Sequence, residues 1–134
     1  MPALMSKPAE IIFAYQGFRF TLEYARQANG EHPALEFFNK LDGRWKARLI
    51  YLYKILGDIG QIQNREMFRK ESGEFWAFKA FQARMLCYFR SDQRVVITHG
   101  FAKKTDKIRV QEFDRAARIK QEYEDYLGRP LERK

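Results

Sequence analysis

The sequence is poor in the residue types that build covalently bridged or metal-bound sites. Its 134 residues include one cysteine, Cys87, and two histidines, His32 and His99. A single cysteine forms no internal disulfide, no thiolate zinc site and no iron–sulfur cluster, and two histidines do not make a three-histidine metal site. We therefore expect a protein that uses neither a metal nor another cofactor.

Long apolar runs are also missing. The longest are a handful of residues, well short of the about 18 that a membrane-spanning helix needs. The first ten residues, MPALMSKPAE, lack the apolar centre of a secretory signal peptide. These absences predict a cytoplasmic protein that does not enter a membrane.

Apolar and basic side chains are abundant. Hydrophobic residues make up 46% and aromatic residues 16%, which excludes intrinsic disorder, and the length predicts one domain. Lys and Arg total 25 against 17 for Asp and Glu, a net charge of +8 that gathers in the second half of the chain. This surplus favours an anionic partner, most commonly nucleic acid, although charge also keeps small proteins soluble.

The N-terminal half predicts a lead-in, one strand and two helices. We expect a flexible lead-in over residues 1–16, a single domain over residues 17–127 and a tail over residues 128–134. Apolar and polar residues alternate over 18–24, which is typical of a half-buried strand. A short helix is predicted from Pro33 and a longer one over residues 44–57, because apolar residues there recur at helical spacing.

The C-terminal half predicts consecutive antiparallel strands and a last helix. Four aromatic and β-branched runs, 66–70, 75–81, 83–90 and 94–102, are joined by short turns, the first at Glu71-Ser72-Gly73-Glu74. An amphipathic helix follows over about residues 108–126. The fold class expected is α+β: a central, mostly antiparallel twisted sheet of about four strands, with two N-terminal helices and a C-terminal helix on one face. The other face is then free for function.

Four cations are candidates for a phosphate site. If Lys79 and Arg84 lie on neighbouring strands, they share a face of the sheet, and Lys103 and Lys104 follow the next strand. Arginine binds phosphate oxygens bidentately and lysine adds a point charge. Each residue also has an ordinary structural alternative: a surface ion pair for Arg84, a solvated loop for the lysines, and a half-buried structural histidine for His99.

The second half of the chain resembles a known family. The resemblance is carried by four segments: Phe68-Arg69-Lys70, Phe75-Trp76-Ala77-Phe78-Lys79, Ala83-Arg84-Met85-Leu86-Cys87-Tyr88-Phe89 and His99-Gly100-Phe101-Ala102-Lys103-Lys104-Thr105. Together they resemble the RelE/ParE superfamily of toxins, in its HigB-like, phage-derived branch, over roughly residues 17–126. The resemblance implies a RelE-like fold.

The resemblance implies the toxin of a type II toxin–antitoxin system. Toxins of this kind are metal-independent mRNA endoribonucleases, or mRNA interferases, that act on messages bound to the ribosome and so inhibit translation. The 2′-hydroxyl of one nucleotide attacks the adjacent phosphate. The partners implied are a cognate antitoxin, often of the helix-turn-helix type, and mRNA on the ribosome, with no metal and no membrane.

The resemblance also implies site residues. Those expected to be catalytic are Arg84, Lys79, Lys104 and His99, and those expected to bind RNA phosphates are Lys70, Arg69, Lys103 and Lys107. Two positions depart from the pattern of the branch: Lys79 stands where the branch has Arg, and Ala77 where it has Glu. The general base is therefore not identified from the sequence.

Two other functions remain open at this point. One is a phage-derived protein that binds RNA or other nucleic acid without cleaving it. The other is a ParE-like toxin that acts on gyrase, which the Lys-Lys-Thr segment at residues 103–105 disfavours.

Overall fold

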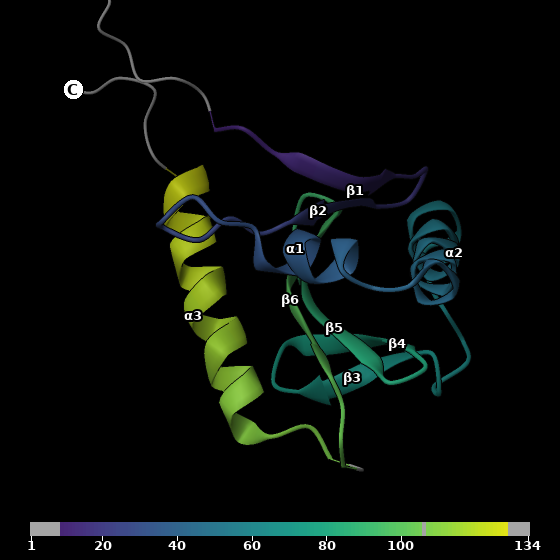
Figure 1. Ribbon diagram of the computed structural model, residues 1–134. Coiled ribbons are helices and arrows are strands. Elements are labelled where there is room, and N and C mark those ends of the chain that lie inside the picture. Colours follow the sequence, from purple (N-terminus) through teal and green to yellow (C-terminus); the bar gives the residue numbers. More distant parts are fainter. Residues whose placement is uncertain (1–8, 106, 129–134) are drawn as a thin grey trace, which may run out of the picture.

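The structure, a computed structural model, describes residues 9–105 and 107–128 (Figure 1). The described residues form three helices and six strands. In chain order the elements are β1 (Ile12–Gln16), β2 (Thr21–Tyr24), α1 (Pro33–Asn39), α2 (Gly43–Ile59), β3 (Phe68–Ser72), β4 (Phe75–Ala80), β5 (Ala83–Arg90), β6 (Arg94–Ala102) and α3 (Val110–Leu127).

All the strands belong to one sheet, in the order β1-β2-β6-β5-β4-β3. Every neighbouring pair is antiparallel except β2 and β6, which are parallel, so the sheet is mixed. The α+β class is confirmed. The expectation of about four mostly antiparallel strands is wrong in number, because β1 and β2 extend the four consecutive strands β3 to β6.

Strand β1 lies within the segment for which the sequence predicts a flexible lead-in, residues 1–16. It pairs with β2 at one edge of the sheet, Ile12 facing Tyr24, and the ladder satisfies the backbone groups on the side that faces β2. The Tyr15 hydroxyl donates a hydrogen bond of 2.7 Å to Asp58 on α2. The earliest part of the predicted lead-in, residues 1–8, and residues 129–134 of the predicted tail lie outside the described residues.

The strand predicted over 18–24 begins only at Thr21, because the preceding residues cross α2. The amides of Arg19 and Phe20 donate to the Gly57 carbonyl at 2.7 and 3.0 Å, so they are not available for a strand ladder. A Cβ on Gly17 would lie 2.2 Å from the carbonyl carbon of Gly57. Only glycine lets the chain pass the helix this closely.

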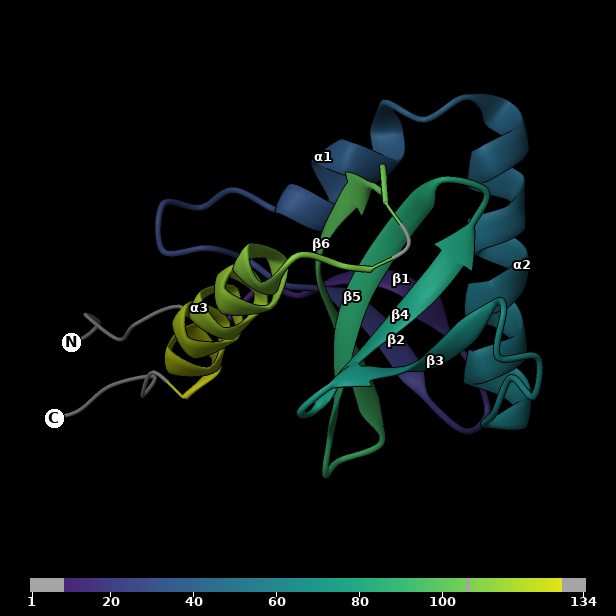
Figure 2. The same ribbon diagram turned by 90° about the horizontal axis from the view of Figure 1, so that it is seen from below.

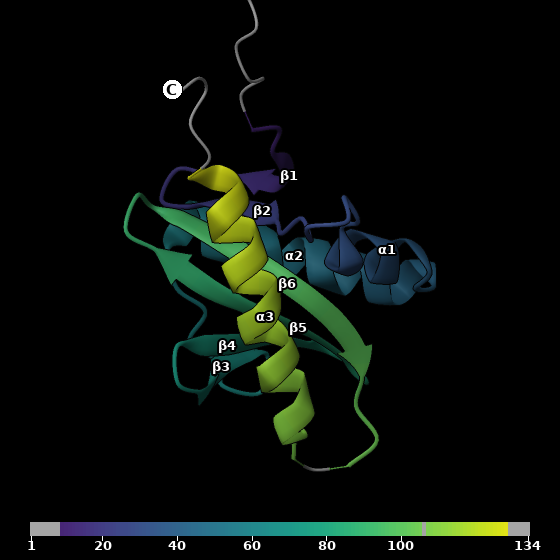
Figure 3. The ribbon, with the colours of Figure 1, turned by 90° about the vertical axis from the view of Figure 1, so that its left-hand side faces the viewer.

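Helices cover both faces of the sheet, not the single face that the sequence predicts. Strand alternation directs Met85 and Cys87 toward a core shared with α2, and Leu86 and Tyr88 toward a second core shared with α3. Figures 2 and 3 show α3 lying across the face opposite to α2. The reason is that α3 has its own apolar stripe, which needs a sheet face to cover it.

Local signals set the ends of α2. The Asp42 side chain caps its start by accepting from the amides of Arg44 and Trp45 at 3.0 and 3.1 Å. Gly60, with φ of 95°, ends it in the left-handed conformation. Over the described part of the chain, no helix has the length and apolar content to cross a bilayer.

Candidate functional site

Lys79 and Arg84 lie directly opposite each other on β4 and β5. They continue the rows that carry Ala77 and Leu86 in the α3-side core, so both project from that face of the sheet. The predicted sharing of a face is confirmed. The connecting turn is Phe81-Gln82, one residue earlier than the sequence predicts.

Arg84 is held by the backbone of its own turn. Its Nη1 donates to the carbonyls of Phe81 and Ala83 at 2.8 and 3.0 Å. The residue is only 8% exposed, and its Nε is buried without a hydrogen-bond partner among the described residues. A buried, unpaired donor costs about 1–3 kcal/mol, so this nitrogen marks a place where an acceptor would stabilise the protein.

Glu71 joins Arg69, Lys79 and Arg84 in one group of charged side chains, the Arg84 cluster. Its Oε2 accepts from Arg69 Nε at 3.0 Å and from Lys79 Nζ at 3.1 Å. The sequence places Glu71 in a turn, but β3 continues through Ser72, so strand alternation puts the Glu71 side chain on the same face as Arg69 and Lys79. This carboxylate is missed from the sequence because the predicted strand ends at residue 70.

The cluster contains groups suited to proton transfer. Burial acts to raise the pKa of Glu71, but hydrogen bonds from Arg69 and Lys79 outweigh it, and the pKa is lowered overall. Burial, with Arg69 and Arg84 nearby, lowers the pKa of Lys79 despite its contact with Glu71. At neutral pH the site therefore holds an ionised carboxylate beside an ammonium that gives up its proton more readily than usual.

The lysines that follow β6 line a neighbouring pocket of about 190 Å³. The Lys103 amide donates to the Gln82 carbonyl at 2.7 Å, and Phe101, which also lines the pocket, lies opposite Arg84. The four cations expected to form one phosphate site therefore divide into two neighbouring places at one end of the sheet. Lys79 and Arg84 belong to the Arg84 cluster, and Lys103 and Lys104 line the pocket beside it. The charged side chains that line the pocket are Lys103, Lys104, Lys107, Arg109 and Glu112.

His99 does not belong to this surface. It is fully buried beneath α3, where its Nε2 lies 2.9 Å from Glu112 Oε1 and its Nδ1 lies 3.3 Å from Thr98 Oγ1. Burial lowers the pKa of His99 to about 4, despite the contact with Glu112. The catalytic role expected for His99 requires an open face, and α3 closes that face.

Lys70 is also separate from the cluster. It pairs with Trp76, whose ring packs in the α2-side core, so Lys70 projects from the opposite face to Arg69. Arg69 joins the cluster through Glu71, as described above. Of the expected phosphate-binding residues, Arg69 therefore lies beside Arg84, the two lysines Lys103 and Lys107 line the adjacent pocket, and Lys70 lies elsewhere.

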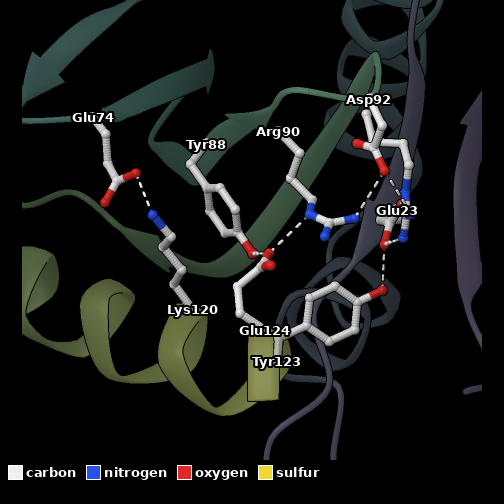
Figure 4. A network of polar contacts seen from close by, with 9 residues as sticks. Glu23, Glu74, Tyr88, Arg90, Asp92, Lys120, Tyr123 and Glu124 are labelled. Atoms are coloured by element: carbon white, nitrogen blue, oxygen red, sulfur yellow. Dashed lines mark hydrogen bonds and ion pairs between the residues drawn. The ribbon is translucent and has the colours of Figure 1, made fainter. Parts of the chain in front are cut away.

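The other end of β5 is also charged, but its charges are paired (Figure 4). Arg94 binds both carboxylate oxygens of the fully buried Glu23, at 2.6 and 2.7 Å. The Tyr123 hydroxyl also donates to Glu23, which ties α3 to β2. Arg90 contacts Asp92 at 3.1 Å. The remaining pairs of the network are Arg94–Asp92, Arg90–Glu124, Tyr88–Glu124 and Lys120–Glu74.

The described residues contain no set of metal ligands. No group of three or more His, Cys, Asp or Glu side chains is arranged there so that it could hold a metal ion.

Comparison with protein families identifies the group to which this architecture belongs. The family described as phage-derived protein Gp49-like (DUF891) matches residues 36–121. The chain belongs to this family. The part that matches runs from α1 into α3 and includes Glu71, Lys79, Arg84 and the pocket lysines. A comparison with curated proteins found no match.

The match places the Arg84 cluster within the Gp49-like part of the chain. Strands β1 and β2 lie outside it, although β2 supplies the Glu23 carboxylate that binds Arg94. The cluster and the pocket beside it are therefore built entirely from Gp49-like sequence.

Proposed function

We propose that this Gp49-like protein is the toxin of a type II toxin–antitoxin system and cleaves mRNA on the ribosome. The observation that carries the proposal is Arg84: a nearly buried guanidinium with an unpaired Nε, beside an ammonium and a carboxylate. The resemblance to the HigB-like branch of the RelE/ParE superfamily and the net charge of +8 also support it.

The reaction proposed is attack of a ribose 2′-hydroxyl on the adjacent phosphorus, which expels the 5′-oxygen of the next nucleotide. It leaves a 2′,3′-cyclic phosphate and a free 5′-hydroxyl. Negative charge builds on the phosphate oxygens as the 2′-oxygen bonds to phosphorus. Arg84 is the group proposed to stabilise that charge, because preorganised donors in a partly buried site act most strongly where charge develops.

Glu71 and Lys79 are proposed as the proton-transfer pair. Glu71 is ionised at neutral pH, so it accepts the proton of the 2′-hydroxyl, and Lys79, with its lowered pKa, donates a proton to the leaving 5′-oxygen. Glu71, from the strand paired with β4, supplies a carboxylate that Ala77 lacks. Lys103, Lys104 and Lys107 are proposed to bind phosphates next to the site.

The partners and the compartment follow from this function. The basic surface around Arg84 suits a cognate antitoxin with acidic segments, and we propose one of the helix-turn-helix type. A toxin that acts on translating ribosomes works in the cytoplasm. The neighbouring reading frame offers a direct check, because it should encode a short DNA-binding protein.

Induced expression in a bacterial host tests the proposal. We expect growth arrest and new mRNA ends with 5′-hydroxyls, mapped within codons by sequencing. Arg84→Ala should abolish both effects, whereas Lys54→Ala, at an exposed position on α2, should retain them. Normal growth and intact messages in cells that accumulate the folded wild-type protein would rule the toxin function out.

A non-catalytic RNA-binding protein is the second candidate, favoured by the Lys79 and Ala77 departures from the branch. It predicts salt-dependent RNA binding without new message ends. The same RNA sequencing separates the two functions. Double-strand DNA breaks without message cleavage would indicate action on gyrase instead.

A further inference from the structure

A second basic cluster lies on the α2 side of the β4–β5 turn. The ring of Phe81 stacks on Trp45, with centroids 5.7 Å apart and an interplanar angle of 17°. The guanidinium carbons of Arg44 and Arg48 lie 4.4 and 5.0 Å from the centroid of the same ring. One aromatic side chain of the turn is thus in contact with two arginines of α2, beside which the turn lies in Figure 2.

The two arginines carry no counter-charge in the described part of the chain. Neither side chain forms an ion pair or a hydrogen bond with a described residue, and the ring of Phe81 is the contact that each makes. Arg69, Arg90 and Arg94 each bind a carboxylate. A guanidinium that contacts an aromatic ring and has no hydrogen-bond partner keeps its N–H groups available, and these groups fit two oxygens of a phosphate.

Two local preferences are broken to form this cluster. Positive charge in the first turn of a helix opposes the helix dipole, yet α2, which begins at Gly43, carries Arg44 in a first turn that contains no acidic residue after the N-cap Asp42. Phe81 has a φ of 57°, a region that costs a non-glycine residue about 1–3 kcal/mol. Unfavourable choices in two elements that meet at one place are typical of a functional site.

We propose that Arg44, Arg48 and Phe81 form a second RNA-binding subsite, which holds nucleotides flanking the scissile linkage. The inference rests on the proposed function in taking RNA as the ligand. The Phe81 carbonyl accepts from Arg84, so the subsite and Arg84 share one turn. A strand of RNA that reaches Arg84 along this end of the sheet therefore meets both arginines.

The chemistry of the cluster favours RNA over an acidic protein segment. An acidic peptide needs only cations, whereas this cluster holds two guanidinium groups against the ring of Phe81, which itself stacks on Trp45. Unpaired RNA bases stack on such guanidinium planes while the backbone phosphates take the N–H groups. The exposed position of Arg44 leaves one plane open to such stacking.

Binding of a labelled RNA that cannot be cleaved tests the subsite apart from catalysis. The probe is a fluorescein-labelled 12-nucleotide RNA with a 2′-O-methyl group on every sugar, which removes the attacking hydroxyl, and binding is read by fluorescence anisotropy between 50 and 200 mM salt. The double variant Arg44→Gln/Arg48→Gln should bind about tenfold more weakly, and its salt slope should fall by about 1.4, at about 0.7 per phosphate contact. A matched control, Lys40→Gln/Lys54→Gln, removes the same charge from exposed positions and should bind like the wild type.

A second variant separates charge from planar geometry. Arg44→Lys/Arg48→Lys keeps both charges but loses the stacked planes, so it should keep the salt slope and still lose affinity. Thermal unfolding of each variant checks that the fold is retained. Equal RNA binding by the wild type and the glutamine variant, or no binding by the wild type, overturns the proposal.

The outcomes remain distinguishable from those for the proposed function. If the wild type cleaves no message but the glutamine variant loses probe binding, the subsite holds and the toxin function fails. If the wild type cleaves messages and the glutamine variant binds the probe unchanged, the subsite fails alone. Unchanged probe binding with weaker binding of poly-L-glutamate would assign the two arginines to an acidic protein partner and overturn the RNA subsite.

Discussion

Both ends of β5 carry several charged side chains, but these charges are paired at one end and partly unpaired at the other. At the β5–β6 end, the cations Arg90 and Arg94 meet carboxylates from β2, the turn and α3, and the network joins the helix to the sheet (Figure 4). At the β4–β5 end, Arg69 and Lys79 share Glu71, but among the described residues Arg84 binds backbone carbonyls without an ion pair, and Arg44 and Arg48 contact the ring of Phe81 without one. Paired charge fixes the structure, whereas unpaired charge is available to a ligand.

The comparison explains how one small sheet is both stable and functional. A fully buried carboxylate such as Glu23 is tolerated because Arg94 and Tyr123 satisfy it. The Nε of Arg84 is buried without a hydrogen-bond partner among the described residues, which lowers the stability of the folded protein. Substitutions at the two ends should therefore separate stability from activity.

The largest effect is expected for Arg84→Ala. Under the proposed function, message cleavage should fall by about 10²–10³-fold, because one preorganised donor to the developing charge is lost. The free energy of unfolding should fall by only about 1 kcal/mol, because the loss of the two Nη1 hydrogen bonds is partly offset by removal of the unpaired buried Nε. Cleavage in a reconstituted translation reaction and chemical denaturation measure the two quantities. A severe loss of stability with cleavage retained would reverse the roles assigned to the two ends.

The next effect is expected for Glu23→Gln at the paired end. It leaves Arg94 without its buried counter-charge and should lower the free energy of unfolding by about 3 kcal/mol. Chemical denaturation measures this loss. Glu23→Gln protein that remains folded should cleave messages at the wild-type rate, because Glu23 lies at the opposite end of β5 from the Arg84 cluster. A stability equal to that of the wild type would show that the network does not anchor α3.

Glu71→Gln sharpens the assignment of the base. Under the proposed function it should reduce cleavage by about 10²-fold, because the neutral amide cannot take the 2′-hydroxyl proton. The acid limb of the wild-type pH profile should lie below the usual range of a glutamate, since the pKa of Glu71 is lowered, and the limb should disappear in the variant. Glu66→Gln, at an exposed position before β3, is the matched control. An unchanged pH profile would remove Glu71 from the reaction.

At neutral pH the smallest effect concerns His99, midway between the two ends. Its pKa of about 4 in the folded protein lies below the ordinary value of 6.5, so the unfolded chain binds a proton more readily. Stability is therefore lost as the pH falls from about 6.5 to 4, by up to about 1.4 kcal/mol per pH unit from this group. Denaturation curves for His99→Gln should show a shallower pH dependence over that range. Identical slopes in the two proteins would mean that His99 titrates normally when folded.

Local patterns predict the elements better than their packing. Period-two alternation correctly places Lys79 and Arg84 on one face, and the helical stripes correctly predict three helices. The stripe of α3 shows that one side is buried but not which sheet face buries it, so the covered face was assigned wrongly. Strand β1 is missed although its sequence, IFAYQ, is rich in strand-forming residues, because the lead-in expected from the polar start of the chain is extended over it.

The residues of the candidate site also differ in how well the sequence predicts them. Arg84 and the pocket lysines are found from charge, facing and family resemblance. Glu71 is missed because the predicted strand ends at residue 70, and the contacts of Phe81 with Arg44 and Arg48 join residues too distant in the chain for any periodicity to connect. Long-range contacts of this kind depend on tertiary packing, which a single sequence does not display.

The position of β6 in the sheet has a consequence for how the protein is made. Strand β6 lies between β2 and β5, and its Arg94 binds a Glu23 that is 71 positions earlier in the chain. The β1–β2 hairpin therefore leaves the ribosome early and has no neighbour in the sheet until β6 is synthesised. Pairing across such a span is slow, because the chain must close a long loop first. The sheet is therefore completed only when β6 inserts between β2 and β5. A nascent chain that stops short of β6 leaves the facing edges of β2 and β5 unpaired, where proteases and chaperones can bind.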